Sequence, residues 1–91
     1  MKRTHVVIEG RVQGVFFRAT MQQAARSLGF AGWVRNLPDG RVEAVLEGEE
    51  KDWPAMLDWC QKGPPRSVVR NVEVTEETYT GDKKDFHIRY L

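Results

Sequence analysis

Nine residues, Gly10-Arg11-Val12-Gln13-Gly14-Val15-Phe16-Phe17-Arg18, separate a short β-branched run from an apolar pattern of helical spacing. The run before them, residues 4–9, predicts a strand, and the pattern after them predicts a helix that begins near Phe17. A glycine-bounded loop between a strand and a helix start can present several backbone amides to one point, where the helix dipole adds positive potential. The segment therefore predicts a strand, an anion-binding loop and a helix, in that order.

Arg18 ends this loop and brings a planar fork of donors that suits a phosphate or a carboxylate. The segment has neither the lysine and hydroxyl of a nucleotide P-loop nor the glycine spacing of a dinucleotide-binding loop. Its glycines also fit a connection that only needs a tight turn. On this segment alone, an anion site and a plain turn both remain open.

After the loop, the sequence predicts a helix and then two consecutive strands. The helix that begins at Phe17 is expected to end near Gly29, where a glycine suits the C-terminal cap. Residues 31–36 and 41–47 are predicted strands, joined by a proline and glycine turn over residues 37–40. In the second of these strands the alternation places three apolar side chains toward the core and three charged ones toward solvent: Val42, Ala44 and Leu46 against Arg41, Glu43 and Glu47.

A second helix is expected to begin after Gly48 at two acidic residues, with Pro54 in its first turn. A break at residues 62–67, a strand at 68–78, a polar loop and a last strand at 86–90 follow. The order β-α-β-β-α-β, with the last strand completing or extending the sheet edge, predicts an α+β, ferredoxin-like fold. In that fold two helices cover one face of an antiparallel sheet, and we expect residues 1–91 to form a single domain.

Composition excludes several classes of protein. A net charge of +1 without runs of like charge gives no reason to expect a nucleic-acid partner, and no stretch reaches membrane-spanning length. Two histidines and one cysteine, Cys60, show no metal-ligand spacing, so neither a metal nor a cofactor is expected, and Cys60 is interpreted as a core residue. Without a signal peptide or a possible internal disulfide, we expect a cytoplasmic monomer.

A second segment, Gly32-Trp33-Val34-Arg35-Asn36-Leu37-Pro38-Asp39-Gly40-Arg41-Val42, makes the loop at Gly10–Arg18 far more specific. Together the two segments closely resemble the acylphosphatase family, whose signatures are a G-x-V-x-G-V-x-F-R loop and a G-W-V-x-N-x-x-x-G-x-V hairpin. The chain matches both at every defining position. The resemblance extends over nearly the whole chain, up to the closing Phe86-His87-Ile88-Arg89-Tyr90.

The resemblance implies that the chain hydrolyses acyl phosphates, the mixed anhydrides of a carboxylic acid and phosphate, and that inorganic phosphate is both product and inhibitor. It implies that Arg18 and Asn36 are the catalytic residues. Arg18 is expected to hold the phosphoryl group and Asn36 to orient the attacking water. The loop amides expected to bind the phosphate are those of Arg11, Val12, Gln13, Gly14, Val15, Phe16 and Phe17.

Simpler roles remain for the two side chains: a surface ion pair for Arg18 and a turn cap for Asn36. The alternative function is a non-catalytic, ferredoxin-like module that binds a small anion or serves regulation. Fold alone does not decide between the module and the enzyme, because this architecture carries many activities.

Overall fold

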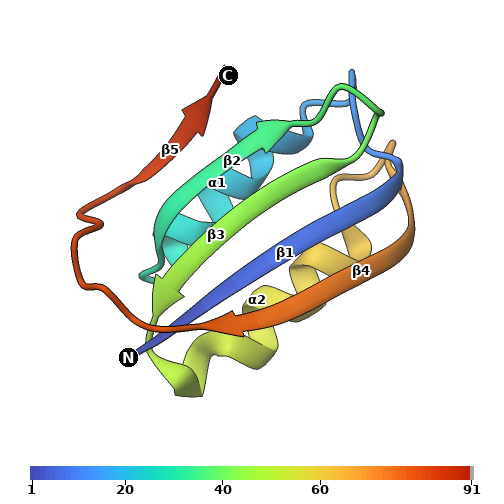
Figure 1. The fold of residues 1–91 in the computed structure, drawn as a ribbon. Helices are drawn as coiled ribbons and strands as arrows, with labels where there is room; N and C mark the ends of the chain where they lie inside the picture. Colours follow the sequence, from blue (N-terminus) through green and yellow to red (C-terminus); the bar gives the residue numbers. More distant parts are fainter. Residues whose placement is uncertain (91) are drawn as a thin grey trace.

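The computed structural model describes residues 1–90; Leu91, the last residue of the expected domain, lies outside the described part. The elements follow the predicted order, with one short 3₁₀ turn added (Figure 1). Their bounds are β1 (Lys2–Arg11), α1 (Phe17–Ser27), β2 (Ala31–Asn36), β3 (Val42–Gly48), η1 (Glu50–Asp52), α2 (Trp53–Lys62), β4 (Val68–Glu77) and β5 (Phe86–Arg89).

The strands form one sheet in the order β4-β1-β3-β2-β5. The first four strands pair antiparallel, which confirms the ferredoxin-like fold, while β5 pairs parallel with β2 at the edge. The sheet as a whole is therefore mixed. The parallel pairing arises because the connection over residues 78–85 leaves β4 at one edge and passes the N-terminus to reach the opposite edge (Figure 1). As a result, β5 runs in the same direction as β2.

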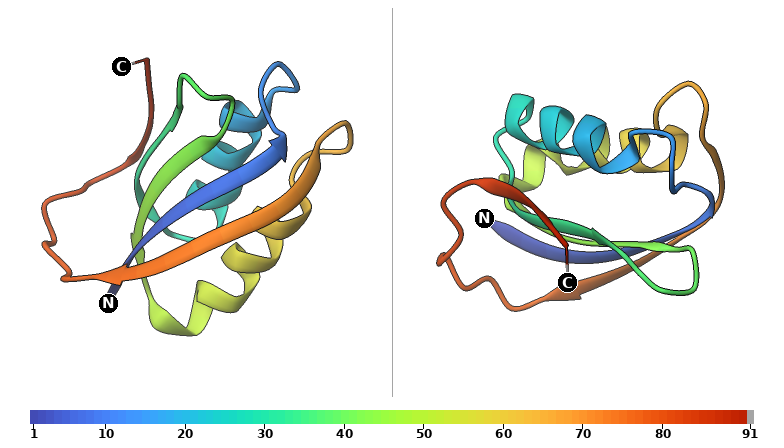
Figure 2. Two further views of the ribbon diagram at one scale, coloured as in Figure 1. Left: turned by 45° about the vertical axis from the view of Figure 1, so that its right-hand side comes forward. Right: turned by 90° about the horizontal axis from the view of Figure 1, so that it is seen from above.

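Both helices lie against the same face of the sheet (Figure 2). Apolar side chains of both layers meet between them, and the alternation expected for β3 is confirmed by its buried valine, alanine and leucine. The largest fully buried side chains are Phe17, Phe86, Ile8, Met21, Leu46 and Met56. None of the helices formed by residues 1–90 is long and apolar enough to cross a membrane.

The first strand is longer than expected and reaches into the glycine loop. Gly10 and Arg11 still pair with β4, after a register shift between Glu9 and Gly10. Gly10 has φ +140, and a Cβ at this position would lie 1.9 Å from the carbonyl oxygen of Val68. The first glycine of the signature is thus required by close strand packing, and the loop proper begins at Val12.

One charged residue of β3 lies on the face that the alternation predicted but is not exposed there. Glu47 is only 3% exposed, although solvent was expected on its side of the strand. The start of the β4–β5 connection folds back over this position, and Glu47 Oε2 accepts hydrogen bonds from the Thr80 amide at 3.1 Å and the Thr80 hydroxyl at 2.9 Å. Arg3 adds a third contact at 3.2 Å. A contact between residues so distant in the chain leaves no trace in the local pattern.

Candidate active site

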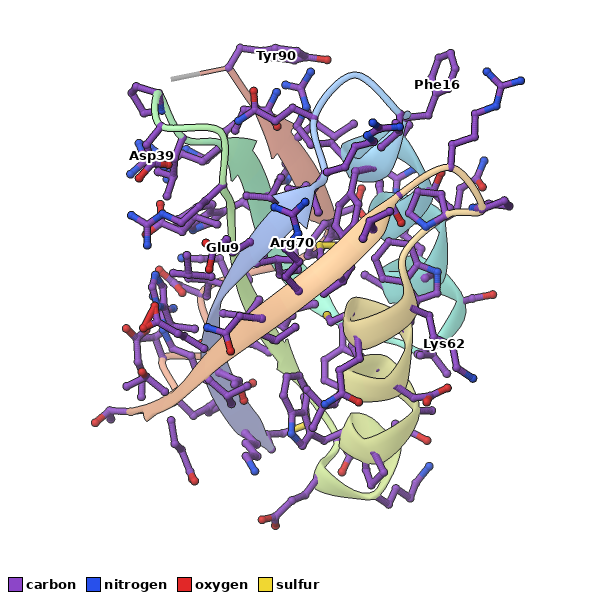
Figure 3. The ribbon with its side chains drawn as sticks, turned by 90° about the vertical axis from the view of Figure 1, so that its right-hand side faces the viewer. Glu9, Phe16, Asp39, Lys62, Arg70 and Tyr90 are labelled. Carbon is purple, nitrogen blue, oxygen red and sulfur yellow. The ribbon has the colours of Figure 1, made fainter. Side chains whose placement is uncertain are left out.

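A pocket of about 360 Å³ opens at one end of the molecule, where four segments of the chain meet. These segments are the loop after β1, the first turn of α1, the end of β2 and the residues at and just after the end of β5. The pocket is lined by Val12, Gln13, Gly14, Phe16, Phe17, Arg18, Ala19, Asn36, Ile88 and Tyr90. Figure 3 shows Phe16 and Tyr90 at this end of the molecule.

The sign of φ alternates along the loop, as it does in backbone nests that bind anions. Gly14 has φ +73 and Phe16 has φ +59, while Val15 between them is not left-handed. Alternation of this kind turns successive N–H groups toward the same side of the chain, where they can share one anion. Phe16 is also the N-terminal cap of α1, which has neither a side-chain cap nor an acidic residue in its first turn. The positive end of the helix is therefore left uncompensated at the pocket.

Gln13 fastens the loop to the β2–β3 hairpin. Its side-chain amide donates one hydrogen bond to the carbonyl of Leu37 at 2.9 Å and a second to the carbonyl of Arg41 at 3.0 Å. The two acceptors lie on the two sides of the hairpin turn, and the Leu37 amide bonds the Arg41 carbonyl in turn. Because Asn36 directly precedes Leu37, these bonds fix the loop amides relative to Asn36.

Arg18 lies in the first turn of α1 and lines the pocket. Its guanidinium lies over the ring of Tyr90, with 4.9 Å between the central carbon and the ring centroid. Among residues 1–90 Arg18 forms no salt bridge, so the ion-pair role considered for it finds no partner there. Stacking restrains the guanidinium without neutralising its charge.

Asn36 is the last residue of β2, where it pairs with Val42 of β3. Its side-chain oxygen, Oδ1, is buried beside the pocket and has no hydrogen-bond partner within the described chain. The turn contact considered for Asn36 is made instead by Asp39, which accepts the Arg41 amide at 3.1 Å. That amide, together with the Arg41 side chain, holds the pKa of Asp39 below its ordinary value. Thr4 and Glu47 each carry a buried, unpartnered side-chain oxygen as well, so it is the place of Asn36 in the pocket that distinguishes it.

The structure brings most of the predicted site residues together. Arg18, Asn36 and five of the seven loop residues line one pocket. Two do not: Arg11 belongs to β1 and pairs with Val68, and Val15 lines a neighbouring groove.

Sequence reasoning gave no role to Ala19, Ile88 or Tyr90, which also line the pocket. Tyr90 and Ile88 reach it because β5 runs parallel to β2 and ends beside Asn36. The only sequence signal for these residues was that the resemblance to the family extends to Tyr90. The strand pattern alone could not place the end of the chain beside Arg18.

Other reactive side chains lie elsewhere. Cys60 is a core residue, as predicted, and its burial raises the pKa of the thiol to about 12. His5 forms a 2.7 Å contact with Glu43, so it is structurally bonded. Within residues 1–90 no group of three or more acidic, histidine or cysteine side chains is arranged to hold a metal ion.

Comparison with known proteins decides the family. A sequence model of the acylphosphatase family matches residues 4–88. The chain belongs to the acylphosphatase family. It is similar to the acylphosphatase of Syntrophus aciditrophicus, at 54% identity over 99% of this chain and 94% of that one. It is also similar to the acylphosphatase of Syntrophobacter fumaroxidans, at 55% identity over 98% of this chain and 92% of that one.

The fold agrees with the sequence. The crystal structure of the acylphosphatase from Bacillus subtilis superposes with a TM-score of 0.94, at 38% identity, and covers 99% of this chain and all of that one. The family resemblance predicted from the two signature segments is confirmed. The chain is therefore an enzyme that hydrolyses acyl phosphates, and the non-catalytic alternative is set aside.

Proposed function

We propose that this acylphosphatase holds the phosphoryl group of its substrate in the loop between β1 and α1 and activates water beside it. The amides from Arg11 to Phe17 and the Arg18 guanidinium neutralise the phosphoryl oxygens, and Asn36 orients the attacking water. The position of Asn36 in the pocket supports this role, because a side-chain amide can hydrogen-bond a water molecule and so aim a lone pair of that water at phosphorus.

The reaction needs little chemical help beyond positioning and charge neutralisation. The water oxygen forms a bond to phosphorus while the bond from phosphorus to the acyl oxygen breaks, and the carboxylate leaves with that electron pair. A carboxylate is a good leaving group, so no protein nucleophile or strong acid is required. The proton released by the water passes to the phosphate or to the departing carboxylate, since Asn36 carries no basic group.

One observation carries this assignment: Arg18 and Asn36, from a helix and a strand, line the same pocket as the uncapped amides of the loop. A site that only bound an anion would be served by the loop and Arg18. A hydrolase also needs a group that can hydrogen-bond a water beside the phosphoryl group, and the side-chain amide of Asn36 is such a group.

The same proposal covers the setting in which the enzyme works. Residues 1–91 act as one domain and as a monomer in the cytoplasm, and inorganic phosphate competes with substrate for the loop. A single buried cysteine, Cys60, is consistent with a reducing compartment. Light scattering of the purified chain tests the monomer, and a dimer at micromolar concentration would contradict it.

The central test is release of phosphate from acetyl phosphate and benzoyl phosphate by the purified chain in excess EDTA. We expect full activity, because the proposed site uses only amides and two side chains. Loss of turnover in EDTA with recovery on adding a divalent metal would contradict the mechanism. Competitive inhibition by inorganic phosphate is expected in the same assay.

A further inference from the structure

Phe16 combines two features that folding alone does not explain. Its side chain is 84% exposed, and its backbone has φ +59, a conformation that bulky residues rarely adopt. In Figure 3 the Phe16 ring points away from the body of the protein, at the end that carries the pocket. The shape of the loop accounts for the left-handed backbone but not for an exposed aromatic ring at a position that glycine or asparagine would adopt with less strain, so the ring itself indicates a function.

The ring connects the phosphate pocket with a second depression. Phe16 lines the pocket that holds Arg18 and Asn36, and it also lines a groove of about 250 Å³ on its other side. The walls of that groove are largely apolar, with Val15 from the loop and Pro64 and Pro65 from the α2–β4 connection. A molecule bound by its phosphoryl group in the loop can therefore extend past Phe16 into an apolar groove.

The direction of the reaction selects this groove for the acyl group. Displacement at phosphorus occurs in line, so the leaving carboxylate departs from the side opposite the attacking water. With the water held at Asn36, the acyl group must extend away from Asn36. A second apolar recess, of about 300 Å³, is lined by Arg18 as well as by Asn36, Leu37 and Pro38. Because its walls include Asn36 and none of residues 12–17, it lies on the side of the water.

The topology of the sheet separates the two depressions. Asn36 ends β2, and the recess beside it is completed by residues 89 and 90 at the end of β5. The groove at Phe16 is completed by the connection that leads into β4, at the opposite edge of the sheet. The phosphate loop, which follows β1, lies between them.

We propose that the Phe16 ring is the contact surface for the acyl group of the substrate, and that it gives the enzyme a preference for aryl and other bulky apolar acyl phosphates. This inference rests on the proposed roles of Asn36 and the loop. An aromatic acyl group stacks on the ring or packs edge-on against it, whereas an acetyl group is too small to cover it.

The test compares benzoyl phosphate with acetyl phosphate in variants that keep the backbone shape of the loop. Phe16→Gly and Phe16→Asn both tolerate a left-handed residue, while Phe16→Tyr keeps the ring. We expect the ratio of kcat/KM for benzoyl phosphate over acetyl phosphate to fall roughly three- to tenfold in the first two variants. It should stay close to the wild-type ratio in Phe16→Tyr. An unchanged ratio in Phe16→Gly and Phe16→Asn overturns the proposal, whatever happens to the absolute rates.

Leu37→Ala is the matched control, because it trims an apolar side chain of the other recess and keeps the carbonyl that Gln13 binds. We expect Leu37→Ala to leave the ratio unchanged. A fall of the ratio in Leu37→Ala with none in Phe16→Gly would place the acyl group in the recess at Leu37 and overturn the proposal. Asn36→Ala separates this question from the mechanism, since loss of the water must slow both substrates equally. Normal rates in Asn36→Ala would contradict the proposed mechanism and, with it, the argument that places the acyl group at Phe16.

Discussion

The Gln13 side chain joins the phosphate loop to the strand end that carries Asn36. Its Nε2 donates to the Leu37 carbonyl at 2.9 Å and to the Arg41 carbonyl at 3.0 Å, so that one amide group spans the hairpin turn. The two halves of the proposed machinery, loop amides and water-orienting side chain, are thereby held at a fixed separation. Catalysis by positioning is sensitive to such distances.

Gln13→Ala should therefore lower kcat about ten- to a hundredfold, because the loop and Asn36 can then drift apart. Gln13→Glu should not rescue the rate, since a carboxylate cannot donate to the two carbonyls. Gln22→Ala is the control: Gln22, in the middle of α1, makes a similar bond, at 2.9 Å to the carbonyl of Phe86 at the start of β5, and does not line the pocket. Equal losses of kcat in Gln13→Ala and Gln22→Ala would show that only general stability is at stake.

Arg18→Ala should weaken inhibition by inorganic phosphate and nearly abolish turnover, because the phosphoryl group is charged in both the ground state and the transition state. Arg18→Lys should recover little, since an ammonium cannot form the two parallel bonds of a guanidinium. The measurement pairs the inhibition constant of phosphate with kcat. Arg26→Ala, on the same helix but paired with Asp85 at 2.8 Å, is the control and should leave both quantities unchanged.

The helices and strands of this chain could be predicted because each has a local signature. Alternation identified β3, and helical spacing identified α1. Pro54 lies in the first turn of α2, as predicted, but the acidic residues expected to open that helix belong to η1 and its N-terminal cap. The ends were less certain, as in β1, whose pairing with β4 continues two residues into the signature loop. Pairing across the sheet extends a strand beyond what its own residues require.

The site was predictable in its residues and not in its shape. The signatures identified Arg18 and Asn36, which line one pocket. They could not show that Phe16 is left-handed or that Tyr90 stacks on Arg18. Outside the site, the pattern likewise could not show that Thr80 covers Glu47. Each of these depends on contacts between segments far apart in the chain, or on the order of strands across the sheet.

Inorganic phosphate should raise the melting temperature of the protein, because an anion bound only by the folded loop stabilises the folded state. At a hundred times the dissociation constant, the gain in unfolding free energy is about 2.7 kcal/mol. Differential scanning calorimetry with increasing phosphate at constant ionic strength measures it. Chloride at the same ionic strength is the control. The effect should largely disappear in Arg18→Ala, and an identical shift in that variant would place the anion elsewhere.

Glu47 should contribute stability that depends on pH. Burial alone raises its pKa, but the bonds from the Thr80 amide and hydroxyl and from Arg3 outweigh burial and lower the pKa below the ordinary 4.5. A lowered folded-state pKa means that the contribution is complete above about pH 4.5 and is lost as pH falls through the folded-state value.

Glu47→Gln should accordingly lower the unfolding free energy at pH 7 by about 1–3 kcal/mol, because Arg3 and Thr80 lose a charged acceptor. The difference from the wild-type protein should shrink on acidification below about pH 4.5, as urea unfolding at several pH values would show. Glu77→Gln is the control, since Glu77 pairs with the same Arg3 at 2.8 Å but is more exposed. It should cost less than Glu47→Gln, and a larger loss in Glu77→Gln would contradict the assignment.

Asn36→Ala tests the division of labour between the two catalytic side chains. Asn36 is proposed to contact only the water, so its loss should cut kcat by on the order of 10²–10³ while the inhibition constant of phosphate stays nearly unchanged. Arg18→Ala should change both, and the two variants therefore differ in one measured quantity. Asn36→Asp keeps an acceptor but places a negative charge beside the phosphoryl oxygens, and it should be at least as slow as Asn36→Ala with weaker phosphate binding. If Asn36→Ala kept normal turnover, the water would have to be held by another group of the pocket. If it lost phosphate binding as severely as Arg18→Ala, Asn36 would have to contact the phosphoryl group itself, and the proposed division of labour would be wrong.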